Sequence, residues 1–138
     1  MTGPLKNFVY FRCALATGNY PDEAKPLAES LSKRLRASGI VVDAIQKNWE
    51  DLRMVCQFQG QTLWLDVTTY VEVQPPEFSL EIKPAGRSYL WWVWRSRVRS
   101  LIEQVDEILH SDPVFTEIRW YRPQDLGKEV SGTDHPFL

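Results

Sequence analysis

The feature that most constrains the fold is the stretch 40–83, in which the apolar pattern has a period of two. That period is typical of strands with one buried face, because successive side chains in a strand point to opposite sides. The pattern predicts strands at 40–45, 52–59, 61–73 and 78–83. Gly60 separates the middle two without a longer loop, so they should form an antiparallel hairpin. Pro75 and Pro76 cannot donate to a sheet ladder and predict the next turn, which makes a three-stranded meander.

A first amphipathic helix is expected before this region. It follows a strand-like run at 8–15, begins near Asp22 and ends at Gly39. Its apolar positions recur at steps of three and four, which is the spacing of one helical face: Ala24, Leu27, Ala28, Leu31 and Leu35.

A second, longer helix is expected after it. The helix begins near Ser88 or near Arg95, because the short aromatic run 89–94 fits a strand equally well. Its apolar stripe consists of Trp91, Trp94, Val98, Leu101, Ile102, Val105, Ile108 and Leu109. Pro113 ends the helix, and 114–121 predicts a last strand.

The expected element order is therefore β-α-β-β-β-β-α-β. Two helices with one apolar stripe each must cover one face of a mainly antiparallel sheet, which predicts an α+β fold of the two-layer sandwich type. The length of 138 residues fits a single domain, 1–138, in which 122–138 forms a loosely ordered C-terminal tail. The other sheet face is expected to meet water or a partner.

Composition excludes several functional classes. There are 16 basic and 18 acidic residues, so no global positive field attracts nucleic acid or anionic lipid. Cys13 and Cys56 lie in apolar stretches and are expected to be reduced core residues. The sequence shows neither a signal-peptide pattern nor an apolar run of the roughly 20 residues that a membrane helix needs. A cytoplasmic location without membrane association is expected.

No catalytic or cofactor motif stands out. The only histidines are His110, which is near a helix end and is expected to complement the helix dipole, and His135, on a tail that cannot hold catalytic geometry, so no catalytic triad is expected. They form no closely spaced ligand pair with a cysteine, so no metal is expected. The glycines are scattered singly, which predicts no nucleotide cofactor. A pair of carboxylates remains open as an enzymatic alternative, with Asp66, Glu72, Glu77 and Glu81 as the candidates. The chain is interpreted as a protein without enzymatic activity.

The open sheet face is the favoured binding surface. Strand alternation puts Trp64, Asp66, Thr68, Tyr70 and Glu72 on the side opposite to Leu63, Leu65 and Val67. Sequential pairing would add Glu77, Ser79 and Glu81 from the next strand. Exposed aromatic residues among acids are typical of protein-binding hot spots. The predicted partner-binding residues are Trp64, Asp66, Tyr70, Glu72, Glu77 and Glu81.

An alternative site lies in the basic and aromatic segment 87–99. Arginine contacts phosphate and aromatic rings stack on bases, so this segment is a candidate site for nucleic acid or another anionic ligand. Its residues are Arg87, Trp92, Arg95, Arg97 and Arg99. The helical register places most of them in structural roles, which makes nucleic acid the less favoured partner.

The arrangement of strands and helices, together with the run WWVWRSRVRSLIEQVDEILHSDPVFTEIRWY, resembles the small immunity proteins that bacteria pair with secreted antibacterial toxins of the type VI or contact-dependent kind. The resemblance implies a non-enzymatic protein that binds a cognate toxin tightly and blocks its active site or substrate entry. It carries over no functional residue. The toxin's activity and the oligomeric state stay open.

Overall fold

A computed structural model describes residues 6–14, 24–48, 51–70, 77–85, 91–122, 125 and 132–136, with the main chain alone for 48 and 91–97. The elements in chain order are β1 (Phe8–Cys13), α1 (Ala24–Ala37), β2 (Val41–Asn48), β3 (Asp51–Phe58), β4 (Gln61–Tyr70), β5 (Glu77–Pro84), α2 (Trp91–Ser111) and β6 (Phe115–Tyr121). This is the predicted element order. None of the described helices is both long enough and apolar enough to cross a membrane.

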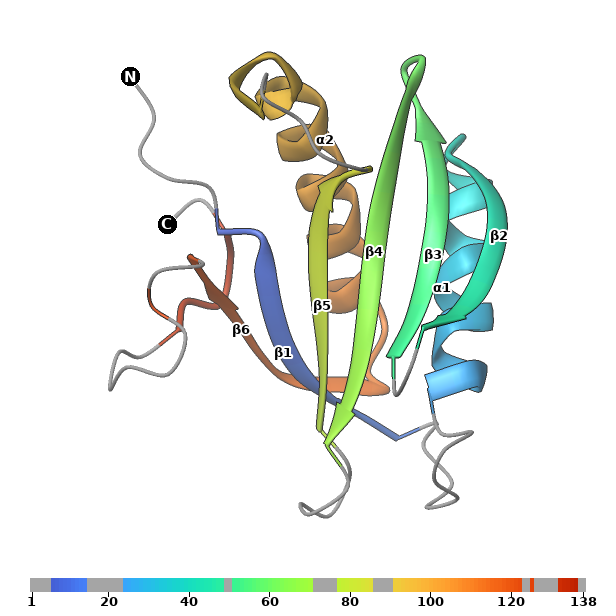
Figure 1. Cartoon of the computed structure of the whole chain (residues 1–138). Coiled ribbons are helices and arrows are strands. Elements are labelled where there is room, and N and C mark those ends of the chain that lie inside the picture. Colours follow the sequence, from blue (N-terminus) through green and yellow to red (C-terminus); the bar gives the residue numbers. More distant parts are fainter. Residues whose placement is uncertain are drawn as a thin grey trace.

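The described strands form one sheet in the order β2-β3-β4-β5-β1-β6, in which every neighbouring pair is antiparallel. The strands β2 to β5 follow one another as a meander, which extends the predicted three-stranded unit by one strand. The N-terminal strand β1 is inserted between β5 and β6 (Figure 1). The sheet therefore pairs β1, from the N-terminal part of the sequence, with β6, which follows the second helix.

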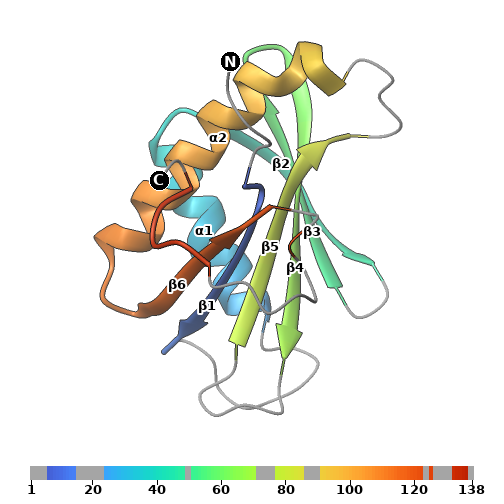
Figure 2. The ribbon, with the colours of Figure 1, turned by 90° about the vertical axis from the view of Figure 1, so that its left-hand side faces the viewer.

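Both helices lie on the same side of the sheet. Helix α1 packs against β2, β3 and β4, whereas α2 packs against β5 and β6. Figure 2 shows the helices as one layer and the strands as the other, and Figure 1 shows the opposite sheet face free of helices. The predicted α+β sandwich with one open sheet face is confirmed.

The core fills the space between these two layers. The predicted stripe of α1 is buried, and so is the part of the α2 stripe from Val98 to Leu109. The side chains of Trp91 and Trp94 lie outside the described residues. Cys13 and Cys56 are buried free thiols, as predicted. The inward side chains of the central strands complete the core: Val9, Phe11, Met54, Leu63, Leu65, Val67, Phe78, Leu80 and Ile82.

Two turns explain where the elements end. Gly39 follows α1 with a φ of 89°, a left-handed conformation that glycine adopts without a steric penalty. Gln59 and Gly60 connect β3 to β4 with φ values of 50° and 76°. Two consecutive positive φ angles are typical of the two-residue turn whose twist matches that of a β-hairpin. The hairpin predicted from Gly60 is confirmed.

Strand β6 contains a bulge that its sequence does not reveal. Glu117 has a φ of 53°, and the pairing with β1 shifts between Tyr10 and Arg12. Simple alternation would put Phe115 and Ile118 on opposite faces. The extra residue lets both be buried.

Candidate protein-binding face

The open face consists of the outward side chains of the described strands. Strands β4 and β5 pair in sequence, with Asp66 opposite Glu81 and Tyr70 opposite Glu77. The predicted binding residues of these two strands therefore share one face, except that Glu72 lies outside the described residues. The neighbouring strands add outward residues to the same face: Phe8, Tyr10, Arg12, Arg53, Val55, Lys83, Arg119 and Tyr121.

Asp66 occupies the middle of this face and is largely covered, with 14% of its side chain exposed. Arg53 from β3 donates two hydrogen bonds to it, from Nε to Oδ1 at 2.7 Å and from Nη2 to Oδ2 at 3.1 Å. Lys83 from β5 lies 3.3 Å from the same carboxylate and 3.2 Å from that of Glu81. The hydrogen bonding to Asp66 raises the pKa of Arg53 above its ordinary value. Asp66 is thus a structural member of an ion-pair network.

Trp64 lies next to this network. The guanidinium carbon of Arg53 is 3.8 Å from the centre of the Trp64 ring, which is a close cation–π contact. The same arginine is held in place by Asp66. Arg53 therefore contacts both the Asp66 carboxylate and the partly exposed Trp64 ring.

A tyrosine group extends the aromatic surface across the sheet. The ring centre of Tyr10 on β1 lies 5.9 Å from that of Tyr70 on β4 and 5.4 Å from that of Tyr121 on β6, with the second pair edge to face. Burial, followed by the influence of Tyr70, raises the pKa of Tyr10 to about 12. The tyrosine group consists of Tyr10, Tyr70 and Tyr121, and it brings together residues from three strands.

Each described acid among the predicted binding residues has a cation beside it. Glu77 pairs with Arg119 at 3.0 Å, while Asp66 and Glu81 contact Lys83. Arg12 and Glu117 form a further ion pair beside them. The sequence pattern placed acids from β4 and β5 on this face. The cations that pair with them are Arg53 of β3, Arg119 of β6 and Lys83 of β5. The described open face is therefore aromatic and near neutral.

The alternative basic segment is described only in part. Arg87 lies outside the described residues, as do the side chains of Trp92, Arg95 and Arg97. Arg99 is partly exposed and pairs with Glu103 one helical turn away, at 3.5 Å. This pairing agrees with a structural role for Arg99, and the anionic-ligand site stays a prediction.

The two sheet edges differ. The edge strand β6 carries an isolated bridge in which Trp120 and Thr133 exchange main-chain hydrogen bonds of 2.7 and 3.2 Å. The other edge strand, β2, exposes Val41 and Ile45, the large hydrophobic side chains most accessible among the described residues. The part of the chain predicted to be a loose tail therefore covers one edge of the sheet at Thr133.

Sequence reasoning missed one cluster of polar side chains. His110 and His135 were weighed separately, yet the fold brings both against Asp106 of α2. The spacing of Asp106 and His110 on one helical face was a readable signal, whereas the position of His135 depends on the path of the C-terminal segment.

No protein-family model, characterised protein or solved structure that was compared with the chain matches it.

Proposed function

We propose that this chain is a non-enzymatic protein-binding domain whose open sheet face contacts a protein partner. The observation that carries the proposal is the fixed aromatic surface: Trp64 held by Arg53, and the tyrosine group spread over three strands. Tryptophan, tyrosine and arginine dominate the energetics of protein interfaces. Rings that are already held in place lose less conformational entropy on binding, which favours affinity.

The paired charges support the same use of the face. An ionised carboxylate that is buried without a partner costs several kcal/mol, whereas Asp66 keeps two cations when the surface is covered. The free-energy cost of removing water from this face when a partner binds is therefore lower than it would be for a surface of unpaired acids. We accordingly expect aromatic packing to determine the affinity, and the association rate to depend only modestly on salt.

For the partner, we propose a cognate bacterial toxin that the domain inhibits by occlusion. The support is the resemblance in the arrangement of elements, together with a broad sheet face of the kind that can cover an active site. A toxin inhibitor of this class acts in the cytoplasm of the cell that it protects, and we propose that location for this chain.

The test begins with affinity capture of the tagged protein from lysate of its own organism, with identification of what remains bound. The dissociation constant of that partner is then measured for the wild type and for Trp64→Ala and Tyr70→Ala. A hot-spot ring contributes about 2 kcal/mol or more, so each alanine variant should weaken binding by about 30-fold. Tyr70→Phe keeps the ring and serves as the matched control. Unchanged affinity in both alanine variants would refute the use of this face.

The inhibitor assignment has its own test. The captured partner, expressed alone, should be toxic, and co-expression of the wild-type chain should restore growth while Trp64→Ala restores it less. A partner that is not toxic would remove the immunity proposal and leave protein binding intact. Recovery of nucleic acid in place of a protein would instead favour the segment 87–99.

A further inference from the structure

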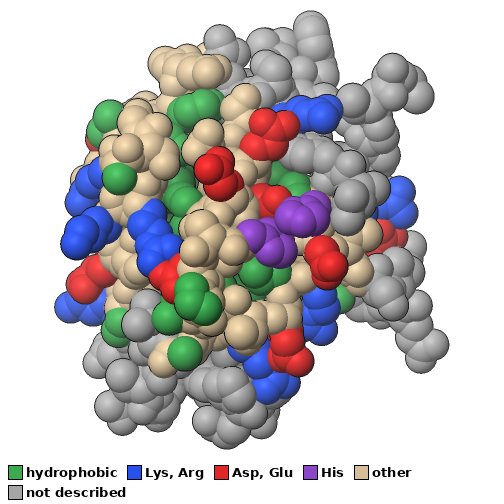
Figure 3. Space-filling view, turned by 180° about the vertical axis from the view of Figure 1, so that it is seen from behind, with side chains coloured by type: hydrophobic (Ala, Val, Ile, Leu, Met, Phe, Trp, Pro, Cys, Tyr) green, Lys and Arg blue, Asp and Glu red, His purple; other side chains and the backbone are tan. Residues whose placement is uncertain are grey.

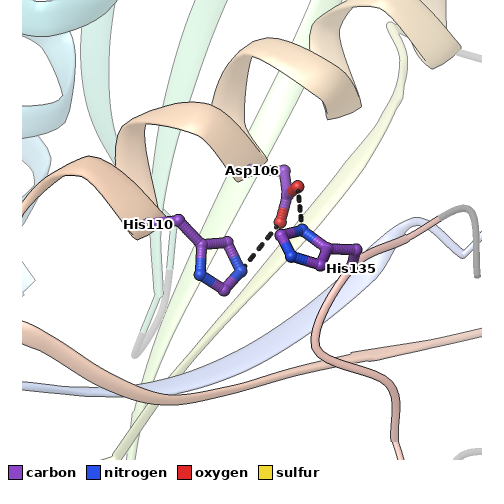
Figure 4. Close-up of side chains that lie close together, drawn as sticks. All are labelled: Asp106, His110 and His135. Carbon is purple, nitrogen blue, oxygen red and sulfur yellow. Dashed lines mark hydrogen bonds and ion pairs between the residues drawn. The ribbon is translucent and has the colours of Figure 1, made fainter.

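Asp106, His110 and His135 converge at one point on the molecule (Figure 4). His110 Nε2 lies 3.2 Å from Asp106 Oδ1, and His135 Nδ1 lies 2.8 Å from Asp106 Oδ2. The two imidazole rings face each other with their centres 4.3 Å apart. The possible ligand atoms of the three residues all lie within 4.8 Å of one another. We call this set the His-Asp cluster.

The carboxylate of the cluster is held by the core. The indole Nε1 of Trp120, a fully buried residue of β6, donates a hydrogen bond of 2.9 Å to Asp106 Oδ1. The Asp106 side chain is only 15% exposed. A hydrogen bond of this kind is what orients a ligating carboxylate in a metal site.

The third residue, His135, is also placed by contacts. Thr133 pairs with the main chain of Trp120, and its hydroxyl donates a hydrogen bond of 2.7 Å to the carbonyl oxygen of His135. The carbonyl oxygen of the intervening Asp134 lies 2.7 Å from His110 Nε2. Segment 132–136 is therefore fixed to both α2 and β6 at the cluster.

The cluster is accessible from outside. The His110 and His135 side chains are 32% and 51% exposed. Figure 3 shows the histidines, in purple, together at the surface on the side opposite to the view of Figure 1, among acidic side chains. An open groove of about 540 Å³ adjoins His110 and is also lined by Asp134 and residues 115–119. A hydrated ion and further ligands can reach the cluster by this path.

We propose that Asp106, His110 and His135 bind a divalent transition-metal ion of the zinc type. Imidazole nitrogen and carboxylate oxygen are the ligands that this class of ion prefers, at about 2.0–2.2 Å. Two atoms at that distance from a tetrahedral ion are about 3.4 Å apart. The nitrogen–oxygen distances of 3.2 and 2.8 Å run to different oxygens of Asp106, so the side chains would shift to place three ligand atoms around one ion.

The ligand set also defines what the site excludes. Calcium takes six to eight oxygen ligands and magnesium requires octahedral oxygen coordination, whereas this cluster offers two nitrogens. The ion would replace the contacts that the two imidazoles make with Asp106, and also the contact between His110 Nε2 and the Asp134 carbonyl oxygen. It would link segment 132–136 to α2, and solvent or an added ligand in the groove would complete its coordination.

The experiment is calorimetric titration of the metal-free protein with Zn²⁺, with Mg²⁺ as the reference ion and the visible absorption of Co²⁺ as a probe of coordination geometry. The wild type should bind one Zn²⁺ per chain and should not bind Mg²⁺. With Co²⁺ it should give the intense visible absorption of tetrahedral coordination. His135→Ala and Asp106→Asn should each lower the Zn²⁺ affinity by at least about 10–100-fold, the loss that even outer-shell changes cause.

The matched control is Glu107→Gln, which removes the exposed carboxylate adjacent to Asp106 in the chain and should leave the Zn²⁺ affinity unchanged. Asparagine at position 106 can still accept the hydrogen bond of Trp120, and His135 is in an exposed segment, so circular dichroism of the variants without metal should match the wild type. Absence of Zn²⁺ binding in the wild type, or equal affinity in folded His135→Ala, would overturn the site. Neither result bears on the proposed binding face, which lies on the other side of the sheet.

Discussion

At the scale of single residues, Arg53 connects the two kinds of chemistry on the open face. Its guanidinium makes two hydrogen bonds to Asp66 and lies 3.8 Å from the centre of the Trp64 ring. The arginine therefore neutralises a largely covered carboxylate and orients an aromatic side chain at the same time. We therefore expect a substitution of Arg53 to lower both the stability of the fold and the affinity for a partner of the open face.

Replacing Arg53 by alanine should lower the free energy of unfolding by about 2 kcal/mol. Hydrogen bonds to charged groups contribute about 1.5–3 kcal/mol, and Asp66 would keep only Lys83 as a cation. Urea denaturation measures the change. Lys47→Ala, on the exposed edge strand β2, is the control and should stay within about 0.5 kcal/mol of the wild type. Equal stability of the two variants would contradict the structural role of Arg53.

A second prediction at this scale concerns alkaline pH. Burial raises the pKa of Cys56 from 9.0 to about 12. Burial, and to a smaller extent the electrostatic influence of Tyr70, raises the pKa of Tyr10 from 10.0 to about 12. Above about pH 9 the unfolded chain loses these protons while the folded chain retains them, so the free energy of unfolding falls between about pH 9 and 12. The full contribution of both groups is present below pH 9.

Denaturation curves at pH 7, 9 and 10.5 measure this fall. Tyr10→Phe and Cys56→Ala each remove one of the two groups, and each variant should lose stability less steeply with rising pH than the wild type. The same slope in all three proteins would argue against both shifts.

The sequence predicted the outward set of β4 correctly, because a period of two decides which side chains share a face. It did not predict their partners. Arg53, Lys83 and Arg119 reach the acids through the pairing of separate strands, and an alternating pattern does not reveal which cation stands opposite which acid. The described outward residues of β4 lie on one face as the alternation predicts, but the cations that pair with their acids could not be read from that pattern.

At the scale of elements, the β3–β4 hairpin shows how turn chemistry sets the register. Gln59 adopts a φ of 50°, which a residue with a side chain takes at a cost and asparagine takes more readily. Gln59→Asn should raise the free energy of unfolding by about 0.5 kcal/mol, since Asn-Gly is the preferred sequence of this turn.

The matched change at the next position should act in the opposite direction. Gly60→Ala should lower the free energy of unfolding by about 1 kcal/mol. Apart from Gly60 and its two chain neighbours, no atom lies within 4 Å of the place where the alanine Cβ would be, so the loss is conformational and not due to a collision. Thermal denaturation of both variants provides the check, and an alanine variant as stable as the wild type would contradict the assigned turn geometry.

Other element boundaries show what a pattern cannot determine. Helix α2 begins at Trp91, so the aromatic run 91–94 is helical, between the two starts considered from the sequence. Propensity did not decide this because the same residues suit a strand. The bulge at Glu117 was missed since it arises from the need to bury both Phe115 and Ile118 against the helices, which is a tertiary requirement.

At the scale of the whole molecule, the sequence predicts the layers of the fold but not the contacts made by the C-terminal segment. The layered architecture was predictable, because two apolar stripes and one alternating sheet have few ways to bury their surfaces. The His-Asp cluster was not, since Asp106 and His135 are 29 residues apart and meet only because segment 132–136 returns to β6. The polar, glycine-containing composition of 122–138 predicted a loose tail and gave no sign of the Trp120–Thr133 bridge.

If the open sheet face binds a protein, hydroxyl-radical footprinting of the chain with and without its captured partner should show protection of that face. Aromatic side chains react readily with hydroxyl radicals, so each face residue reports its own accessibility. We expect Trp64 and Tyr70 to become protected in the complex while His110 and His135, behind the sheet, react as before. Protection confined to the histidine side, with Trp64 and Tyr70 unchanged, would show that the open face is not the binding surface.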